Sequence, residues 1–254
     1  MNMINSNRLS GKVAIVTGSS KGLGAEVAKQ FAREGASVIV NYSSSKAAAE
    51  AVVSHIQNFG GKAKAIQANM GNPEDVSALF TQAYDAFGSL DILVNNAGVY
   101  DFLPIEQLSL ESFRKHFELN VYGYLLAIKT SLKYFKKDGG SIINMSSTVT
   151  IFGPVNASTY TATKGAIDGL TRALSNELAQ RKIRVNAIKP GVVATEGVVD
   201  GGFLDSDFGK ETAAVTPLGR LGLASDISPA VVYLASDESA WMTGETIVLS
   251  GGHR

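Results

Sequence analysis

Short runs of apolar, mostly β-branched residues alternate with longer mixed segments along almost the whole chain. Such runs are typical of strands buried on both faces of a parallel sheet. They predict seven strands, at residues 13–17, 37–41, 63–67, 92–95, 142–145, 184–188 and 246–249. The segments between them are predicted as helices at 24–34, 45–59, 73–87, 111–136, 160–180 and 225–235. This alternation predicts an α/β fold, a doubly wound parallel sheet with helices on both faces.

Two segments depart from the alternation. Residues 1–9 are mostly polar, and we expect them to form an N-terminal tail. Residues 192–217 contain Gly201-Gly202 and Pro217 but no strand or helix pattern. Because long irregular segments in compact domains are usually functional, we expect a lid over the substrate here, with a loose loop as the alternative. No linker or repeat marks a second domain, so residues 1–254 are expected to form one domain.

Composition narrows the partners and the chemistry. Lys and Arg number 23 and so do Asp and Glu, and this balance argues against nucleic acid as the main partner. No apolar run approaches the ~20 residues that span a bilayer, so no membrane partner is expected. The chain has no cysteine, which excludes thiol nucleophiles and thiolate metal sites and fits a cytoplasmic protein. The three histidines are scattered, so we expect no metal site.

The end of the first predicted strand carries a glycine-rich turn. Thr17-Gly18-Ser19-Ser20-Lys21-Gly22-Leu23-Gly24 leads directly into the next predicted helix. Glycines in such a turn let the backbone bend tightly and approach a pyrophosphate, which the N–H groups of the helix N-terminus can bind. Because a strand precedes the turn and a helix follows it, the sequence predicts a dinucleotide site.

The end of the second predicted strand indicates which dinucleotide. An NAD site commonly places a carboxylate there, but no acidic residue occurs before Glu50. Ser43 and Ser44 could donate to a 2′-phosphate, and Lys21 could supply positive charge. We therefore expect NADP(H) as the preferred cofactor, with NAD(H) as the alternative. The serines could also simply cap the next helix.

Tyr160 and Lys164 are the candidates for proton transfer. Residues four apart on a helix lie on the same face, so the phenol and the ammonium group should be neighbours. A free tyrosine has a pKa of about 10, and the cation of Lys164 together with an oxidised nicotinamide ring would favour the phenolate. Ser147 follows the fifth predicted strand and could hydrogen-bond the same substrate oxygen. With Asn95-Asn96-Ala97-Gly98, these residues lie at the sheet edge where open α/β sheets bind ligands.

In these motifs the chain closely resembles the classical short-chain dehydrogenase/reductase (SDR) family, over residues 9–252. The matching motifs occur in the family's order and spacing: Thr17-Gly18-x-x-x-Gly22-x-Gly24, Asn95-Asn96-Ala97-Gly98, Ser147, Tyr160-x-x-x-Lys164 and Pro190-Gly191. The chain looks most similar to the branch with 3-oxoacyl-[acyl-carrier-protein] reductases, glucose dehydrogenases and other ketoreductases.

The resemblance implies a role for each catalytic position. Tyr160 would act as general acid in reduction and general base in oxidation, and Ser147 would orient the reacting oxygen. Lys164 would hold the nicotinamide ribose and lower the pKa of Tyr160. Asn120 would support a water that links Lys164 to solvent.

The resemblance also implies further cofactor contacts. Asn69 and Met70 would flank the adenine, while Val193 and Thr195 would contact the carboxamide end. With the residues already discussed, the expected cofactor-binding set is Gly18, Ser20, Lys21, Gly22, Leu23, Gly24, Ser43, Ser44, Asn69, Met70, Asn96, Ala97, Gly98, Tyr160, Lys164, Pro190, Gly191, Val193 and Thr195.

Two positions depart from the family pattern, and one family property is expected here. Asn69 stands where an aspartate is frequent, and Lys189 replaces the usual asparagine before Pro190, for which the sequence offers no physical reason. The family commonly forms homotetramers through the helices that match residues 111–136 and 160–180. Apolar positions recur on both: Leu125, Ile128 and Leu132, and Ala166, Leu170 and Leu174. A core-facing stripe would look the same.

The function expected is reversible, NADP(H)-dependent hydride transfer to a small-molecule carbonyl compound or from an alcohol. Ile151, Phe152, Val155 and Phe203 are expected near the pocket and favour a largely uncharged substrate. A different possibility is a 3-oxoacyl-[acyl-carrier-protein] reductase, for which Lys136, Lys137, Arg181 and Lys182 could form a basic patch near the site mouth. A sugar dehydrogenase and a non-catalytic NADP(H)-binding sensor are two further candidate functions.

Overall fold

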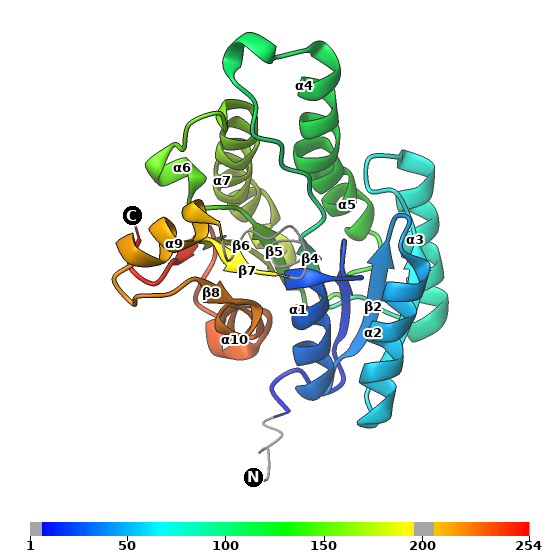
Figure 1. Ribbon diagram of the computed structural model, residues 1–254. Coiled ribbons are helices and arrows are strands. Elements are labelled where there is room, and N and C mark those ends of the chain that lie inside the picture. The colour runs from blue at the N-terminus through cyan, green and yellow to red at the C-terminus, as the bar shows by residue number, and fades with distance from the viewer. Residues whose placement is uncertain (1–6, 196–205, 254) are drawn as a thin grey trace.

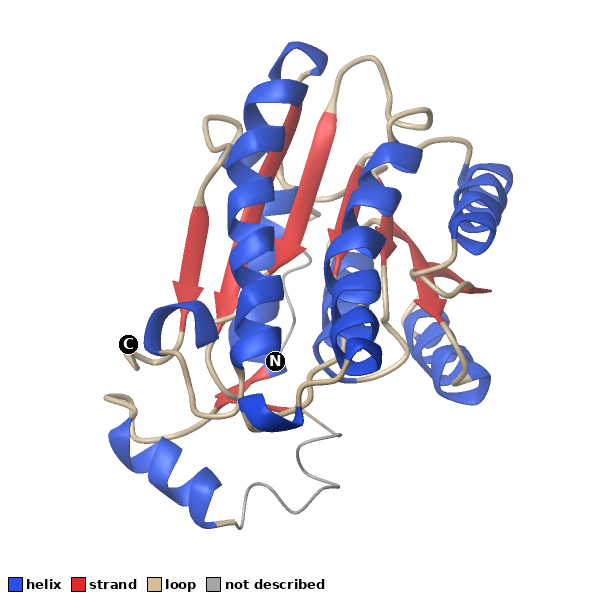
Figure 2. Ribbon diagram, turned by 90° about the horizontal axis from the view of Figure 1, so that it is seen from above, coloured by secondary structure: helices blue, strands red, loops and turns tan. Residues whose placement is uncertain are grey.

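Seven parallel strands form the central sheet, in the order β3-β2-β1-β4-β5-β6-β9 (Figures 1 and 2). In the computed structural model, residues 7–195 and 206–253 are described. The strands of the sheet are β1 (Val13–Val16), β2 (Ser37–Tyr42), β3 (Lys62–Gln67), β4 (Ile92–Asn95), β5 (Gly140–Met145), β6 (Ile183–Pro190) and β9 (Thr246–Leu249). All seven predicted strands are confirmed, and the doubly wound fold class with them.

Helices cover both faces of the sheet (Figure 1). One layer consists of α1 (Gly22–Arg33), α2 (Lys46–Asn58) and α10 (Ala224–Ala235), and the other of α3 (Pro73–Phe87), α5 (Gly123–Ser131) and α7 (Ser158–Leu178). Successive residues of a strand point to opposite faces, so Ala14 and Val16 pack in the first layer and Ile15 in the second. This explains why the strands read as continuous apolar runs.

The chain order of the strands reverses between β1 and β4, which lie side by side in the middle of the sheet. The helices that follow these two strands leave toward opposite faces, and open α/β sheets bind ligands in a crevice at the carboxyl ends of such a strand pair. The glycine-rich turn after β1 and the Asn-Asn-Ala-Gly turn after β4 both border this crevice.

The helix predicted at 111–136 is divided in the structure. It consists of α4 (Leu110–Phe117), a π-helical turn η2 (Glu118–Tyr122) and α5, which ends at Ser131 rather than at residue 136. π-Turns inside helices occur frequently at functional sites, and this one contains Asn120. The remaining helical turns are η1 (Ile105–Gln107), α6 (Val149–Phe152), η3 (Ala179–Arg181) and η4 (Asp237–Ser239).

The predicted tail is shorter than residues 1–9. Leu9 is fully buried in the core, and its N–H donates to the carbonyl oxygen of Glu34. Arg8 forms an ion pair of 2.6 Å with the Glu34 carboxylate. These contacts fasten the chain just before β1, while residues 1–6 lie outside the described residues.

The segment expected to form a lid has regular structure in its described parts. β7 (Val193–Ala194) pairs with β8 (Gly222–Leu223) in a small parallel sheet of its own. α9 (Asp207–Val215) begins after Ser206, whose hydroxyl accepts from the N–H of Gly209. Residues 196–205, Phe203 among them, lie outside the described residues, so the lid stays a prediction.

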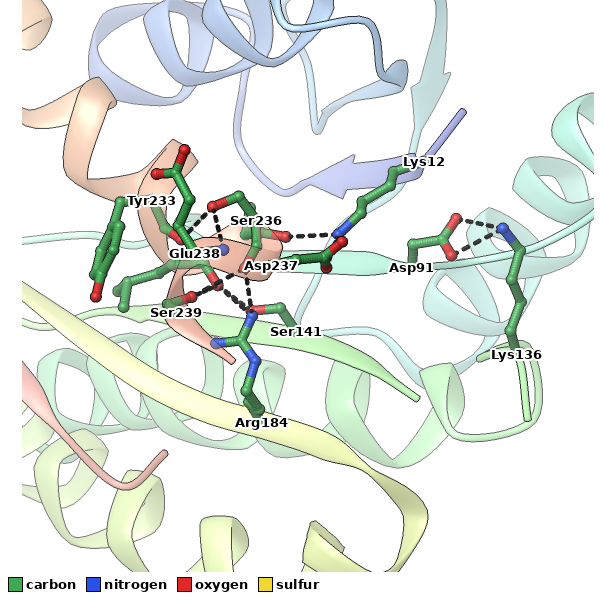
Figure 3. Close-up of polar contacts among 12 residues, drawn as sticks. Lys12, Asp91, Lys136, Ser141, Arg184, Tyr233, Ser236, Asp237, Glu238 and Ser239 are labelled. Atoms are coloured by element: carbon green, nitrogen blue, oxygen red, sulfur yellow. Dashed lines mark hydrogen bonds and ion pairs between the residues drawn. The ribbon is translucent and has the colours of Figure 1, made fainter. Parts of the chain in front are cut away.

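The amino-terminal edge of the sheet holds a groove of about 470 Å³. Two ion pairs lie in it, Lys12 with Asp237 and Lys136 with Asp91 (Figure 3). Arg184 also lines this groove, and it donates to the main-chain carbonyl of Leu234 at 2.8 Å. The groove and the crevice described above thus lie at opposite ends of the strands.

Candidate active site

The glycine-rich turn has the geometry of a ligand cradle. Gly18 and Gly22 have φ angles of +61° and +60°, which side chains rarely tolerate. A Cβ atom on Gly24 would lie 2.5 Å from Nδ2 of Asn96 and 2.7 Å from the carbonyl oxygen of Gly18. At Gly24 the backbone therefore lies closer to Gly18 and Asn96 than a residue with a side chain would allow. This fits a turn that surrounds a pyrophosphate.

The N-terminus of α1 offers its N–H groups to a ligand. Its N-cap residue, Lys21, makes no side-chain capping hydrogen bond, and its first turn contains no acidic residue. At the start of α3, by contrast, the Asn72 side chain accepts from the N–H groups of Glu74 and Asp75. Since uncapped N–H groups and the helix dipole attract anions, α1 fits the pyrophosphate of a dinucleotide and α3 does not.

Two polar residues hold the turn in place, and the sequence analysis assigned neither of them a role. The Thr17 hydroxyl accepts from the N–H groups of Asn96, at 2.9 Å, and of Ala97, at 3.0 Å. The buried Asn41 side chain accepts from the N–H of Gly18 at 3.0 Å and donates to the carbonyl of Ala68 at 3.1 Å. A polar residue near the end of an otherwise apolar strand was the available signal for both.

Asn96 and Gly98 belong to the second turn that borders the crevice. The Asn96 side chain donates to the carbonyl oxygens of Thr17 and Gly18 at 2.9 and 3.1 Å, so it joins the two turns. A Cβ on Gly98 would lie 3.0 Å from Oδ1 of Asn120. The structure thus brings Asn96, Ala97 and Gly98, all predicted to bind the cofactor, together with the glycine-rich turn.

The corner expected to bind the ribose is exposed. Lys21, Ser43 and Ser44 all face solvent. In the described part of the chain, neither serine hydroxyl makes a hydrogen bond, and the N-cap residue Ser45 makes no capping bond either. The alternative in which Ser43 and Ser44 cap the next helix finds no support.

Asn69 and Met70, predicted to flank the adenine, face in different directions. Asn69 is exposed and lines a hollow of about 680 Å³ together with Val99 and Leu119. Its side-chain oxygen accepts from the N–H of Gly71 at 3.0 Å. The Met70 side chain is only 4% exposed and packs in the core. Contact of Asn69 and Met70 with the adenine stays a prediction.

Ser147, Tyr160 and Lys164 meet at the carboxyl end of β5. Ser147 follows β5, and hydrogen bonding from its hydroxyl lowers the pKa of Tyr160 on α7, so the two side chains lie close together. The Nζ atom of Lys164 lies 5.7 Å from the centre of the Tyr160 ring and donates to the carbonyl of Met145 at 2.7 Å. The three side chains predicted to carry the chemistry are therefore neighbours.

The pKa of Tyr160 differs from the sequence-based expectation. Burial raises it to about 12, because the phenolate would lose hydration. The hydrogen bond with Ser147 lowers this pKa, and Tyr100 raises it further. In the protein alone the phenol is thus protonated near neutral pH.

Lys164 is itself buried, with 4% of its surface exposed. Burial lowers its pKa to about 8, and the negative charge of Asp168 acts in the opposite direction. A buried lysine of this kind is charged at neutral pH and loses its proton a little above it.

Asn120, the fourth predicted catalytic residue, anchors the loop after β4. Its side chain accepts from the N–H of Val99 and donates to the Val99 carbonyl, both at 2.8 Å. It also donates to the Thr163 hydroxyl at 3.2 Å. These contacts tie the loop to α7. The water that Asn120 was expected to support stays a prediction.

The residues after β6 close the crevice from the other side. The N–H of Thr148 donates to the carbonyl of Pro190 at 3.1 Å, and the N–H of Gly191 donates to the carbonyl of Leu249 at 2.8 Å. Thr195 faces the glycine-rich turn, since its Cβ lies 3.4 Å from the position that a Cβ on Gly22 would take. Thr195 thus lies beside the glycine-rich turn, whereas Val193 packs against the core of the first layer.

Two aromatic rings that the sequence analysis did not single out stand beside Tyr160. The ring centres of Tyr100 and Phe102 lie 6.1 and 6.5 Å from that of Tyr160. Both rings are about half exposed. The loop that carries them is held by the buried His116, whose Nε2 accepts from the N–H of Asp101 at 3.1 Å. Their positions directly after the Asn-Asn-Ala-Gly turn were the available signal.

Neither a metal centre nor a membrane-spanning helix is found in the part of the chain that the structure describes. No three His, Cys, Asp or Glu side chains there come together in a way that could hold a metal ion. No helix there has the length and apolar character needed to cross a bilayer.

Comparison with known proteins identifies the family. A family model described as enoyl-(acyl carrier protein) reductase matches residues 18–254. An uncharacterized oxidoreductase of Methylorubrum extorquens is 49% identical over 98% of this chain and 100% of its own length.

Two solved structures share the fold. A short-chain dehydrogenase/reductase from Serratia marcescens is 36% identical, with a TM-score of 0.91 over 97% of this chain and 99% of its own. The angucycline C-6 ketoreductase LanV with bound NADP is 33% identical, with a TM-score of 0.90 over 97% of this chain and 96% of its own. The chain therefore belongs to the short-chain dehydrogenase/reductase family and is an oxidoreductase that acts on carbonyl or alcohol groups.

Proposed function

We propose that this protein is an NADP(H)-dependent ketoreductase that interconverts a small-molecule ketone and its secondary alcohol. The observation that carries the proposal is the meeting of Ser147, Tyr160 and Lys164 at the carboxyl end of β5, on the same sheet edge as the glycine-rich turn after β1. A panel of ketones and alcohols, followed by the absorbance of reduced nicotinamide with each cofactor, tests it. No turnover on any carbonyl compound would favour a non-catalytic NADP(H)-binding sensor instead.

In the proposed reaction the protein handles the proton. The bound cofactor supplies or accepts the hydride. Tyr160, whose pKa of about 12 keeps the phenol protonated, gives its proton to the substrate oxygen during reduction. Ser147 donates a hydrogen bond to the same oxygen and holds it toward Tyr160. Lys164 binds the nicotinamide ribose and places a positive charge near the phenol.

The exposed corner formed by Lys21, Ser43 and Ser44 supports NADP(H) over NAD(H). These residues offer one cation and two hydroxyl donors, and β2 is followed by no acidic residue before Glu50. LanV, a relative with bound NADP, points the same way.

Lys21→Ala is expected to raise the KM for NADPH about tenfold or more and to leave the KM for NADH nearly unchanged. A hydrogen bond to a charged phosphate contributes about 1.5–3 kcal/mol, and only NADPH carries the 2′-phosphate. Steady-state kinetics with both cofactors measure the difference. Lys62→Ala, which removes an exposed lysine at the start of β3, is the matched control. Faster turnover with NADH than with NADPH in the wild type would contradict the assignment.

The surroundings of Tyr160 support an apolar, ring-bearing substrate. Tyr100 and Phe102 stand beside the phenol, and Ile151 and Val155 are exposed nearby in sequence, Val155 to 84%. Large exposed apolar side chains favour an uncharged substrate over a sugar. The acyl-carrier-protein hypothesis loses part of its basis, because Lys136 and Lys182 line the groove at the opposite edge of the sheet.

Phe102→Ala is expected to raise the KM for a fused-ring ketone such as 2-tetralone about tenfold. Burying one aromatic side chain against a ligand contributes about 1.5–3 kcal/mol. A small ketone such as acetoin does not reach this ring, and its KM should stay the same. Phe59→Ala removes a phenylalanine of similar exposure after α2, 42% against 49% for Phe102, and serves as the control. A KM that rises equally for both ketones would contradict a substrate contact.

We further propose a cytoplasmic homotetramer that packs α5 and α7 against other copies. Ile128 is buried in the core of its own subunit, and Leu132 and Leu174 are partly buried against the same core. Leu125, Ala166 and Leu170 are half-buried and remain available to a partner. The mass in solution, measured by light scattering, tests this proposal.

A further inference from the structure

Lys189, the unusual residue before Pro190, has an ion-pair partner on α7. Its Nζ atom lies 2.7 Å from Oδ2 of Asp168, and the two side chains are only 14% and 11% exposed. In such a buried ion pair both charged groups lose much of their hydration. The net contribution of the pair to the stability of the protein is therefore often small. We therefore expect the pair to act mainly on the residues around it.

Asp168 is also held from a second side. The hydroxyl of Ser146 donates to its Oδ1 atom at 2.7 Å. Ser146 is buried and directly precedes Ser147, and its hydroxyl lies 3.4 Å from the carbonyl oxygen of Lys164. The Asp168 carboxylate is thus fixed between the end of β5, β6 and α7. It lies one helical turn after Lys164.

Lys164 has few charged groups around it. Its ammonium group donates to Met145 and lies 5.4 Å from the ring centre of Tyr124 and 5.7 Å from that of Tyr160. The titratable or charged groups that act on it are Tyr124 on α5 and Tyr160 and Asp168 on α7, and Lys189 on β6 is paired with Asp168. Among these groups Asp168 is the only carboxylate, and it raises the pKa of Lys164 against the effect of burial.

We propose that Asp168 and Lys189 are positioning residues that set the charge and the direction of Lys164. Asp168 keeps the buried ammonium group protonated. Lys189 binds the Asp168 carboxylate from the side of β6. The carboxylate therefore does not draw the ammonium group of Lys164 away from Tyr160. The inference rests on the function proposed above, because it assigns a purpose to the charge of Lys164.

The decisive measurement is the titration of Lys164 in the ligand-free protein, followed by NMR of ¹³C-labelled lysine and assigned with Lys164→Met. Asp168→Asn is expected to lower the pKa of Lys164 by about one unit, because an attractive charge is lost and the repulsion by Lys189 remains. Lys189→Met is expected to raise it by a smaller amount. The double variant should lie between the two single variants.

If Asp168 and Lys189 had a merely structural role, Asp168→Asn and Lys189→Met would not shift the pKa of Lys164 in opposite directions. Lys189→Arg keeps the ion pair and should restore the wild-type titration. Lys136→Met breaks a comparable pair with Asp91, 2.9 Å long, at the other edge of the sheet (Figure 3) and should change nothing. Shifts in the same direction, or none, would overturn the proposal. Should Asp168→Asn fail to fold, Lys189→Met and Lys189→Arg decide: equal titrations overturn the proposal, and a rise in Met alone supports it.

The alkaline limb of kcat/KM for NADPH-dependent reduction should follow the same order among the variants. This second measurement separates the two proposals. A wild-type protein that reduces no ketone refutes the proposed function, yet the NMR order still decides the role of Asp168 and Lys189. Normal turnover with unchanged titrations refutes the positioning pair alone.

Discussion

Tyr160→Phe is expected to lower kcat by a factor of about 10² to 10⁴, the usual contribution of a positioned general acid. The substitution removes one hydroxyl and keeps the ring that packs beside Tyr100 and Phe102. The affinity for NADPH should therefore stay close to that of the wild type. Steady-state kinetics and a fluorescence titration of NADPH measure the two quantities separately.

Tyr100→Phe is the matched control, because it removes a hydroxyl from the neighbouring ring. Tyr100 raises the pKa of Tyr160, so its hydroxyl influences the phenol without giving up the proton in the reaction. We expect only a small change in kcat. Retained turnover in Tyr160→Phe, or an equal loss in both variants, would refute the role assigned to Tyr160.

Gly18→Ala is expected to destabilise the protein by about 2–5 kcal/mol and to abolish cofactor binding. A side chain at positive φ costs about 1–2 kcal/mol, and overpacking adds about 1–3 kcal/mol. The new Cβ would lie 2.8 Å from Cα of Ala97, a backbone atom that cannot move without displacing the second turn of the crevice. Urea unfolding measures the stability, and the NADPH titration measures the binding.

Gly88→Ala separates the two causes. Gly88 also has a positive φ, +76°, but a Cβ there would meet no atom within 4 Å. It should therefore lose only about 1–2 kcal/mol, and NADPH binding should persist. Equal losses of stability in the two variants would show that the close approach to Ala97 has no effect.

The strands and the crevice were accessible to sequence analysis because their signals are local. Val13 to Val16 form an apolar run of the length of a strand, and glycines between a strand and a helix are typical of a dinucleotide site. Tyr160 and Lys164 share a helix face through their spacing alone. For such features a few consecutive residues carry the whole argument.

Other features depend on contacts between distant segments. Leu9 is buried although polar residues surround it in the sequence, because it packs beneath α1 and pairs with Glu34. The pKa of Tyr160 depends on how much of its surroundings are dry, and no spacing rule contains this information. The reason for a lysine at position 189 is visible only in the fold, because α7 places Asp168 beside it.

The π-turn at Glu118–Tyr122 sets the rotation of α5 about the helix axis relative to α4. Each residue of an α-helix advances by about 100°, so a wider turn changes the angle at which α5 presents its side chains relative to α4. One nearly continuous helix can thereby direct Asn120 toward Val99 and Tyr124 toward Met145 and Lys164. The rotation of this helix thus couples the loop that contains Val99 to the residues around Lys164. One residue inserted or deleted between Asn120 and Tyr124 would turn one of these two side chains away from its partners.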